Sequence, residues 1–120
     1  MHKLTLALLL AASVVFTGCR SHAPRYLTIT NPAGEQILSL TRLGTHARTS
    51  SVHLRVTGKI DGDATLVLLQ EKQPRQTLTL ATGAVDTSWH GDWSGNQMTL
   101  HYLPGTVKSG GLQITCEFSD

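Results

Sequence analysis

The chain has few of the residues and runs that point directly to a fold or a site. It contains only two cysteines in 120 residues, which excludes the disulfide framework that holds many small secreted domains together. Its apolar run covers thirteen residues, 4–16, whereas a membrane-spanning helix needs about 20. Beyond residue 18, no stretch repeats its apolar residues with a helical period, so an α-helical domain is excluded as well.

Sequence signatures of catalysis and of nucleic-acid binding are also missing. No serine lies in the glycine pattern of a nucleophile elbow, and no glycine loop of the phosphate-binding type leads into a helix. Without Lys3, nine lysines and arginines stand against eight aspartates and glutamates, and they form no basic cluster that would displace counterions from a nucleic acid. We therefore expect no catalytic residues, no cofactor and no nucleic-acid partner.

The first nineteen residues have the order of a bacterial export signal. A short basic start precedes the apolar run, whose length matches the apolar core of a signal peptide. The run ends in Phe16-Thr17-Gly18-Cys19, where small residues lead into a cysteine. This segment resembles the bacterial lipoprotein signal with its lipobox, and Phe16 stands where that family usually carries an aliphatic residue.

The resemblance implies that residues 1–18 are removed and that Cys19 carries a diacylglycerol on its thiol and a further acyl chain, such as palmitate, on its amino group. Several chains hold a protein on a bilayer, since each buried methylene contributes about 0.8 kcal/mol. Residues 19–25 then form a tether. Arg20, in place of an aspartate after the cysteine, favours the periplasmic side of an outer membrane where the host has one. An ordinary signal peptide with a chance cysteine and an uncleaved apolar anchor are the alternatives.

Residues 26–120 have the pattern of one all-β domain. Short runs with β-strand chemistry recur at intervals of about 8–12 residues, between turn signals rich in glycine, proline and aspartate. This spacing predicts a single antiparallel β-sandwich of about seven or eight strands, immunoglobulin-like or similar, with a small barrel as the alternative. The predicted strands are 26–30, 36–42, 52–60, 64–70, 77–80, 85–89, 97–103 and 112–118.

Short motifs predict how some of these strands connect. Asp61-Gly62-Asp63 has the composition of a tight hairpin turn, so the strand after it is expected to return beside 52–60. Gln73-Pro74-Arg75 is expected to turn the chain, and residues 90–96 are expected to form a loop. The run 64–70 is apolar on both faces, which predicts a place in the middle of a sheet.

Cys116 is expected to be a core residue. Apolar and polar residues alternate in the last predicted strand, so Cys116 shares its face with Leu112, Ile114 and Phe118. A buried cysteine behaves as a small hydrophobic residue with a raised pKa and little reactivity. If Cys19 instead stays unlipidated in a secreted chain, a Cys19–Cys116 disulfide becomes the alternative.

The second half of the chain carries a further resemblance. Its closing apolar strand is preceded, in order, by Gly58-Lys59-Ile60-Asp61-Gly62, Gly91-Asp92-Trp93, Tyr102-Leu103-Pro104 and Ser109-Gly110-Gly111-Leu112. This series resembles small secreted β-sandwich proteins of bacteria that have no assigned activity. The motifs are turns and core anchors, so the resemblance implies a fold and brings no activity with it.

One short stretch gathers the residues that we single out as a candidate ligand-binding site. Trp89 and Trp93 flank His90 and Asp92, and two indole rings near one loop can form a stacking platform for sugar rings or apolar groups. The alternative is that both rings cap the end of the core, with each N–H bonded to the backbone. Asp92 then accepts hydrogen bonds within its own turn.

Two pairs of residues have metal-ligand chemistry but too few ligands for a site. His90 with Asp92, or Asp61 with Asp63, would leave calcium short of its roughly 6–8 oxygens and a catalytic zinc short of its usual set of about three protein ligands. Turn formation explains the two aspartates at 61 and 63 without a metal. We therefore expect no metal site.

These observations predict a non-catalytic envelope lipoprotein that binds or scaffolds other envelope components and is held at the membrane through Cys19. Two alternatives stay open. The first is a glycan or small-ligand binding module that uses Trp89 and Trp93. The second is a periplasmic enzyme inhibitor acting through residues 89–96, or an enzyme.

Overall fold

The computed structural model describes residues 24–43 and 48–120. The expected signal segment with its helix, Cys19 and most of the tether lie outside the described residues. The described ranges form eight strands, and within them there is no helix of the length and hydropathy needed to cross a bilayer. The strands are β1 (Arg25–Ile29), β2 (Gln36–Thr41), β3 (Ser51–Ile60), β4 (Ala64–Gln70), β5 (Gln73–Leu80), β6 (Gly83–Asp92), β7 (Gln97–Leu103) and β8 (Gly110–Ser119).

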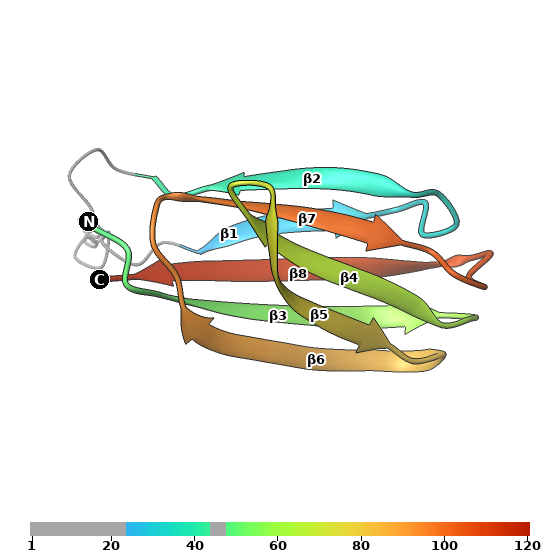
Figure 1. Cartoon of the computed structure of the whole chain (residues 1–120). Helices are drawn as coiled ribbons and strands as arrows, with labels where there is room; N and C mark the ends of the chain where they lie inside the picture. The colour runs from blue at the N-terminus through green and yellow to red at the C-terminus, as the bar shows by residue number, and fades with distance from the viewer. Residues whose placement is uncertain (1–23, 44–47) are drawn as a thin grey trace, which may run out of the picture.

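The strands form two four-stranded antiparallel sheets that pack face to face (Figure 1). Sheet A has the order β1-β8-β3-β6 and sheet B the order β2-β7-β4-β5. This is the order of a jelly roll, in which the pairs β1–β8, β2–β7, β3–β6 and β4–β5 are nested along the chain. The predicted all-β sandwich is confirmed, and so is the central place of 64–70, since β4 lies between β7 and β5.

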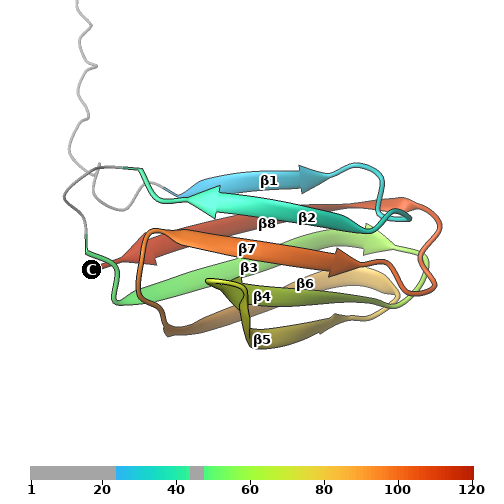
Figure 2. The same cartoon turned by 45° about the horizontal axis from the view of Figure 1, so that its top comes forward.

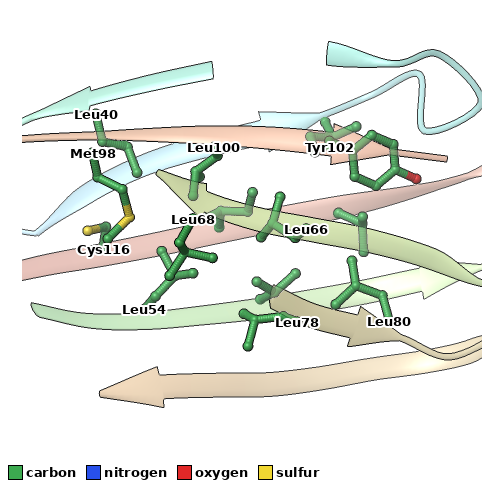
Figure 3. Packing of buried hydrophobic residues seen from close by; sticks show 14 of the residues in the cluster. Leu40, Leu54, Leu66, Leu68, Leu78, Leu80, Met98, Leu100, Tyr102 and Cys116 are labelled. Carbon is green, nitrogen blue, oxygen red and sulfur yellow. The ribbon is translucent and has the colours of Figure 1, made fainter. Parts of the chain in front are cut away.

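Alternation of apolar and polar residues builds the core between the sheets. Along β3, Val52, Leu54 and Val56 are buried, whereas His53 and Arg55 are exposed. Figure 3 shows labelled side chains from both sheets pointing toward one another in this space. Each apolar side chain that is fully buried in this way stabilises the fold by roughly 1.5–3 kcal/mol.

Cys116 lies in this core, as predicted. Its side chain is 0% exposed, and on β8 it shares the inward face with Ile114 and Phe118. Burial raises the pKa of its thiol to about 12, with a smaller contribution from the carboxylate of Glu117. The thiol therefore stays protonated and unreactive at neutral pH.

Three predicted connections are wrong. Asp61-Gly62-Asp63 joins β3 of sheet A to β4 of sheet B, so it crosses between sheets and closes no hairpin. Gln73-Pro74-Arg75 belongs to β5, and the turn before it consists of Glu71 and Lys72, whose φ angles of 50° and 69° are those of a type I′ hairpin turn. Residues 90–92 extend β6 instead of starting a loop.

The sandwich has two ends, which we call proximal and distal. At the proximal end β1 begins, β8 ends and residues 93–96 join β6 to β7, whereas at the distal end β3 ends and β8 begins (Figures 1 and 2). The buried side chain of Arg42 ties the proximal end together, since it donates to the Thr49 hydroxyl at 3.1 Å and to the Asp120 carboxylate at 2.5 Å. The first described strand, β1, thus begins at the end that Arg42 holds together.

Candidate functional site

Trp93 and Trp89 pack together at the proximal end. Trp93, between β6 and β7, is 2% exposed, and its indole N–H donates a hydrogen bond to the backbone oxygen of Gln97 at 3.1 Å. Trp89, on β6, is partly buried against the core, and the two rings meet edge to face with centroids 6.3 Å apart. This is the arrangement expected of tryptophans that cap a core.

Polar side chains cover the outer side of Trp93. The guanidinium of Arg75 lies over the ring, 5.6 Å from its centroid, and donates a hydrogen bond to the side-chain oxygen of Gln70. Gln70 in turn donates to the backbone oxygen and to the hydroxyl of Ser94. The cation–π contact and this chain of bonds leave little of the ring open to a sugar.

The other two candidate residues lie on the outer surface of sheet A. Because β6 continues to Asp92, its residues alternate, and His90 and Asp92 are exposed while Trp89 is directed inward. The His90 ring meets the ring of His53 on β3 edge to face, with centroids 5.8 Å apart. The structure brings Asp92 and Trp93 together in the lining of one hollow of about 230 Å³, which Trp89 and His90 do not line. The four predicted residues therefore do not form one site, and ligand binding by them stays a prediction.

Asp61 holds the β7–β8 connection in place at the distal end. One carboxylate oxygen accepts hydrogen bonds from the backbone N–H groups of Lys108 at 2.8 Å and Ser109 at 3.0 Å, and the other oxygen accepts from the Ser109 hydroxyl at 2.9 Å. These hydrogen bonds lower the pKa of Asp61 to about 2, and the bond from the Lys108 N–H makes the largest contribution.

The neighbouring Asp63 accepts a hydrogen bond from the N–H of Thr82 at 3.0 Å. Among the residues that the structure describes, no three acidic, histidine or cysteine side chains converge as metal ligands.

Asp61→Asn is expected to destabilise the domain at neutral pH and to remove part of its acid sensitivity. Folding lowers the pKa of Asp61 from 3.8 to about 2, so its contribution to the free energy of unfolding is fully present above about pH 4 and is lost as the pH falls toward 2. Denaturant titrations between about pH 2 and 5 measure this loss. The difference between wild type and variant should shrink as the pH falls, and a constant difference would contradict the expected linkage.

Two adjoining hollows lie on sheet A at the distal end. Their volumes are about 460 and 480 Å³, and both are lined by Gly110 and Gly111. Gly58 lines the first and Gly83 the second. Because these positions have no side chains, the backbones of β3, β6 and β8 form an open floor. We call the two hollows together the glycine hollow.

The close approach of β3 and β8 requires two of these glycines. Gly58 has a φ of +143° and Gly110 a φ of +131°, conformations that other residues rarely adopt. A β-carbon on Gly58 would overlap the carbonyl oxygen of Gly111, and one on Gly110 would overlap that of Lys59. Gly111 differs, since a β-carbon there would meet only the carbonyl oxygen of Ile29, at 3.8 Å. The space beside Gly111 is therefore open.

The rim of the glycine hollow carries uncharged hydrogen-bonding side chains, one ammonium group and the carboxylate of Asp61. Thr28, Thr57 and Gln113 border the first hollow, and Lys59, Asp61 and Ser109 border the second. The Asp61 carboxylate already accepts hydrogen bonds from Lys108 and Ser109. Hydroxyl and amide side chains both donate and accept hydrogen bonds. A ligand with many hydroxyl groups would find partners around the whole rim.

Sequence reasoning missed the glycine hollow, because it assigned these glycines to turns and core positions. The available signal was a glycine inside the predicted strand 52–60, since a glycine within a strand marks a kink or a close approach of a ligand or another backbone. Recognising the hollow also required the register of β3 with β8, which places Gly58 beside Leu112 and Ile60 beside Gly110.

Comparisons with known proteins bear on the fold alone. No known family and no curated protein sequence matches the chain. Among solved structures it is similar to the nucleoplasmin-like N-terminal domain of Drosophila FKBP39, with 17% identity over 88% of this chain and 95% of that chain and a TM-score of 0.48. It is also similar to the C-terminal domain of EclA, a sugar-binding protein, with 15% identity over 88% and 84% and a TM-score of 0.46. A third similar structure is CBM4, with 13% identity over 80% and 71% and a TM-score of 0.42.

Proposed function

We propose that this chain is a non-catalytic binding module of the bacterial envelope, anchored through lipid on Cys19, that takes a neutral hydroxyl-rich ligand such as a glycan segment in the glycine hollow. The observation that supports it most is the floor of the hollow, where the backbones of Gly58, Gly110 and Gly111 carry no side chains. A sugar ring approaches such a floor closely. The rim then supplies donors and acceptors for its hydroxyl groups.

The position of the glycine hollow suits a module that is held at its other end. The first described strand, β1, begins at the proximal end, and the hollow lies at the distal end, near the start of β8. An anchored domain would therefore present the hollow away from the bilayer. Residues 19–24 span up to about 20 Å when extended, which leaves room between the domain and the membrane.

The alternative glycan site at Trp89 and Trp93 has less support. Trp93 is 2% exposed, and Arg75 already covers its ring. Tryptophan fluorescence separates the two sites, since both tryptophans of the chain lie at the proximal end. A ligand that stacks on the indoles changes their emission, whereas a ligand in the distal glycine hollow leaves it unchanged.

Filling the glycine hollow tests the proposal. Gly111→Leu adds a side chain where the structure has open space, so the fold is expected to persist while the ligand is excluded. We expect peptidoglycan fragments or neutral oligosaccharides to shift the NMR amide signals of Gly58, Gly110 and Gly111 in the full chain held in detergent micelles. The variant should bind at least about tenfold more weakly, a difference of about 1.4 kcal/mol. Ser88→Leu, at an exposed position of β6, is the matched control and should bind as the wild type does.

Two results would overturn binding in the glycine hollow: a wild type without amide shifts across the whole panel, or a Gly111→Leu variant that binds as well as Ser88→Leu.

The anchor is tested separately by mass spectrometry of the amino-terminal peptide. This peptide is expected to begin at Cys19 and to carry acyl chains. An unmodified peptide, or one that begins at Met1, contradicts the lipid anchor but does not affect the proposal that the glycine hollow binds a ligand.

A further inference from the structure

In the described residues, four strands have a free edge. β1 and β6 end sheet A, and β2 and β5 end sheet B. A free edge presents unpaired N–H and C=O groups to any other strand, and proteins protect such edges with charges, prolines, bulges or charged residues that point inward. The four edges of this sandwich differ in that protection.

Three of the edges carry protective features. β5 contains Pro74, and its pairing with β4 shifts register part-way along the strand. β6 has exposed carboxylates at Asp86 and Asp92. β1 is only five residues long, and Arg25 occupies its inward face, the face of the buried Ile29. A strand that approached β5 would find no N–H donor at Pro74 and an irregular hydrogen-bond ladder. A strand that approached β6 or β1 would lie next to a charged side chain.

β2 carries none of these features. Its sequence, Gln-Ile-Leu-Ser-Leu-Thr, has no charge, proline or glycine, and all six residues pair with β7 without a register shift. Ile37 is 69% exposed on the outer face, and Leu38 is only half-buried on the inner face. Short uncharged segments with strand-forming residues pair readily with further strands. Of the four edges, β2 is therefore the one suited to a partner strand.

We infer that β2 pairs antiparallel with β2 of a second copy of this chain, across a two-fold axis perpendicular to sheet B. An axis in this direction keeps the inner faces of the two copies on one side. Leu38 and Leu40 of both copies then lie toward the core, and Ile37 lies on the outer surface. The two four-stranded sheets B become one continuous sheet, and the free edge disappears.

Charge favours a second copy as the occupant of this edge. Self-pairing brings residues of a strand close to their own counterparts, and like charges that face each other across a strand pair are destabilising. Pairing through β6 would bring Asp92 of each copy toward Asp86 of the other, where Arg55 offsets only the Asp86 charge through an ion pair at 3.0 Å. Pairing through β5 would bring Arg75 of both copies together. Pairing through β2 brings no charges together. Glu35, which precedes β2, is already hydrogen-bonded to His101 at 2.5 Å.

Sedimentation velocity of the full chain in density-matched detergent micelles tests the inference. The wild type is expected to show a monomer–dimer equilibrium that depends on concentration. Ser39→Lys, at an exposed position in the middle of β2, places a cation on each copy at the paired edge. The variant should raise the dissociation constant at least about tenfold. Thr79→Lys, at an exposed position of the edge strand β5, is the matched control and should dimerise as the wild type does.

Amide hydrogen exchange locates the contact. Protection of the β2 amides is expected to rise with protein concentration, while that of the β5 amides stays constant. A wild type that remains monomeric at every concentration, or Ser39→Lys and Thr79→Lys variants that dimerise equally, would overturn the inference. Protection of β2 that appears only when another protein is added assigns the edge to a foreign strand and overturns it as well.

Discussion

Trp93→Ala is expected to lower the free energy of unfolding by about 3–5 kcal/mol. The ring is 2% exposed, meets Trp89 edge to face and donates to the backbone oxygen of Gln97. Removing it leaves a cavity at the proximal end of the core and takes away the surface over which Arg75 lies. Because small domains are stable by only about 5–15 kcal/mol, this is a large fraction of the total. Denaturant titration followed by circular dichroism measures the loss.

Two further variants show whether the Trp93 ring acts as a core cap. Trp93→Phe keeps an aromatic ring and removes the N–H donor, so we expect a smaller loss, of about 1–3 kcal/mol. Trp89→Ala should also cost less than Trp93→Ala, since Trp89 is only partly buried. A loss below about 1 kcal/mol for Trp93→Ala would show that the indole contributes little to the core, and a platform for ligands would regain support.

Gly58→Ala is expected to cost about 3 kcal/mol or more. The residue has a φ of +143°, and a backbone held in such a region costs other residues about 1–3 kcal/mol on its own. In addition, the new β-carbon would overlap the carbonyl oxygen of Gly111, so β3 and β8 would have to separate where they pair. Thermal and denaturant unfolding of the full chain would show the loss.

Gly111→Ala is the matched control for Gly58→Ala, because both positions line the same hollow. A β-carbon on Gly111 has open space around it, so the cost should stay within about 1 kcal/mol. Equal losses for the two variants would contradict this distinction. A larger loss for Gly58→Ala than for Gly111→Ala would show that Gly58 is required where β3 pairs with β8. It would also show that the glycine hollow can be filled at Gly111 without unfolding the domain.

The inward faces of the strands could be predicted, whereas three of the connections could not. Alternation along 112–118 is a property of neighbouring residues, so it identified Cys116, Ile114 and Phe118 as core residues, and all three are buried. Asp61-Gly62-Asp63 gave a wrong hairpin because the same turn residues suit a return within one sheet and a crossing to the other. Which of the two occurs depends on the strands that pair with β3, and these are β6 and β8.

The candidate site illustrates the same limit. Trp89, His90, Asp92 and Trp93 are neighbours in sequence, and a loop over residues 90–96 would have let them converge. Instead β6 pairs with β3 as far as Asp92, opposite Ser51. Backbone hydrogen bonds to β3 keep 90–92 extended in spite of the glycine, and the resulting alternation separates Trp89 from its neighbour His90. Of the four residues, only Asp92 and Trp93 line a common hollow.

The sequence by itself determined the all-β class, the inward faces of the strands and the burial of Cys116, because each depends on residues that are close together along the chain. Only the tertiary structure decided the nested order of the strands, the glycine hollow and the unprotected edge of β2. Each of these depends on which distant segments become neighbours. Gly58 forms part of a hollow because Gly110 and Gly111, some fifty positions later, lie beside it. That pairing is selected by the packing of two whole sheets, and no local pattern encodes it.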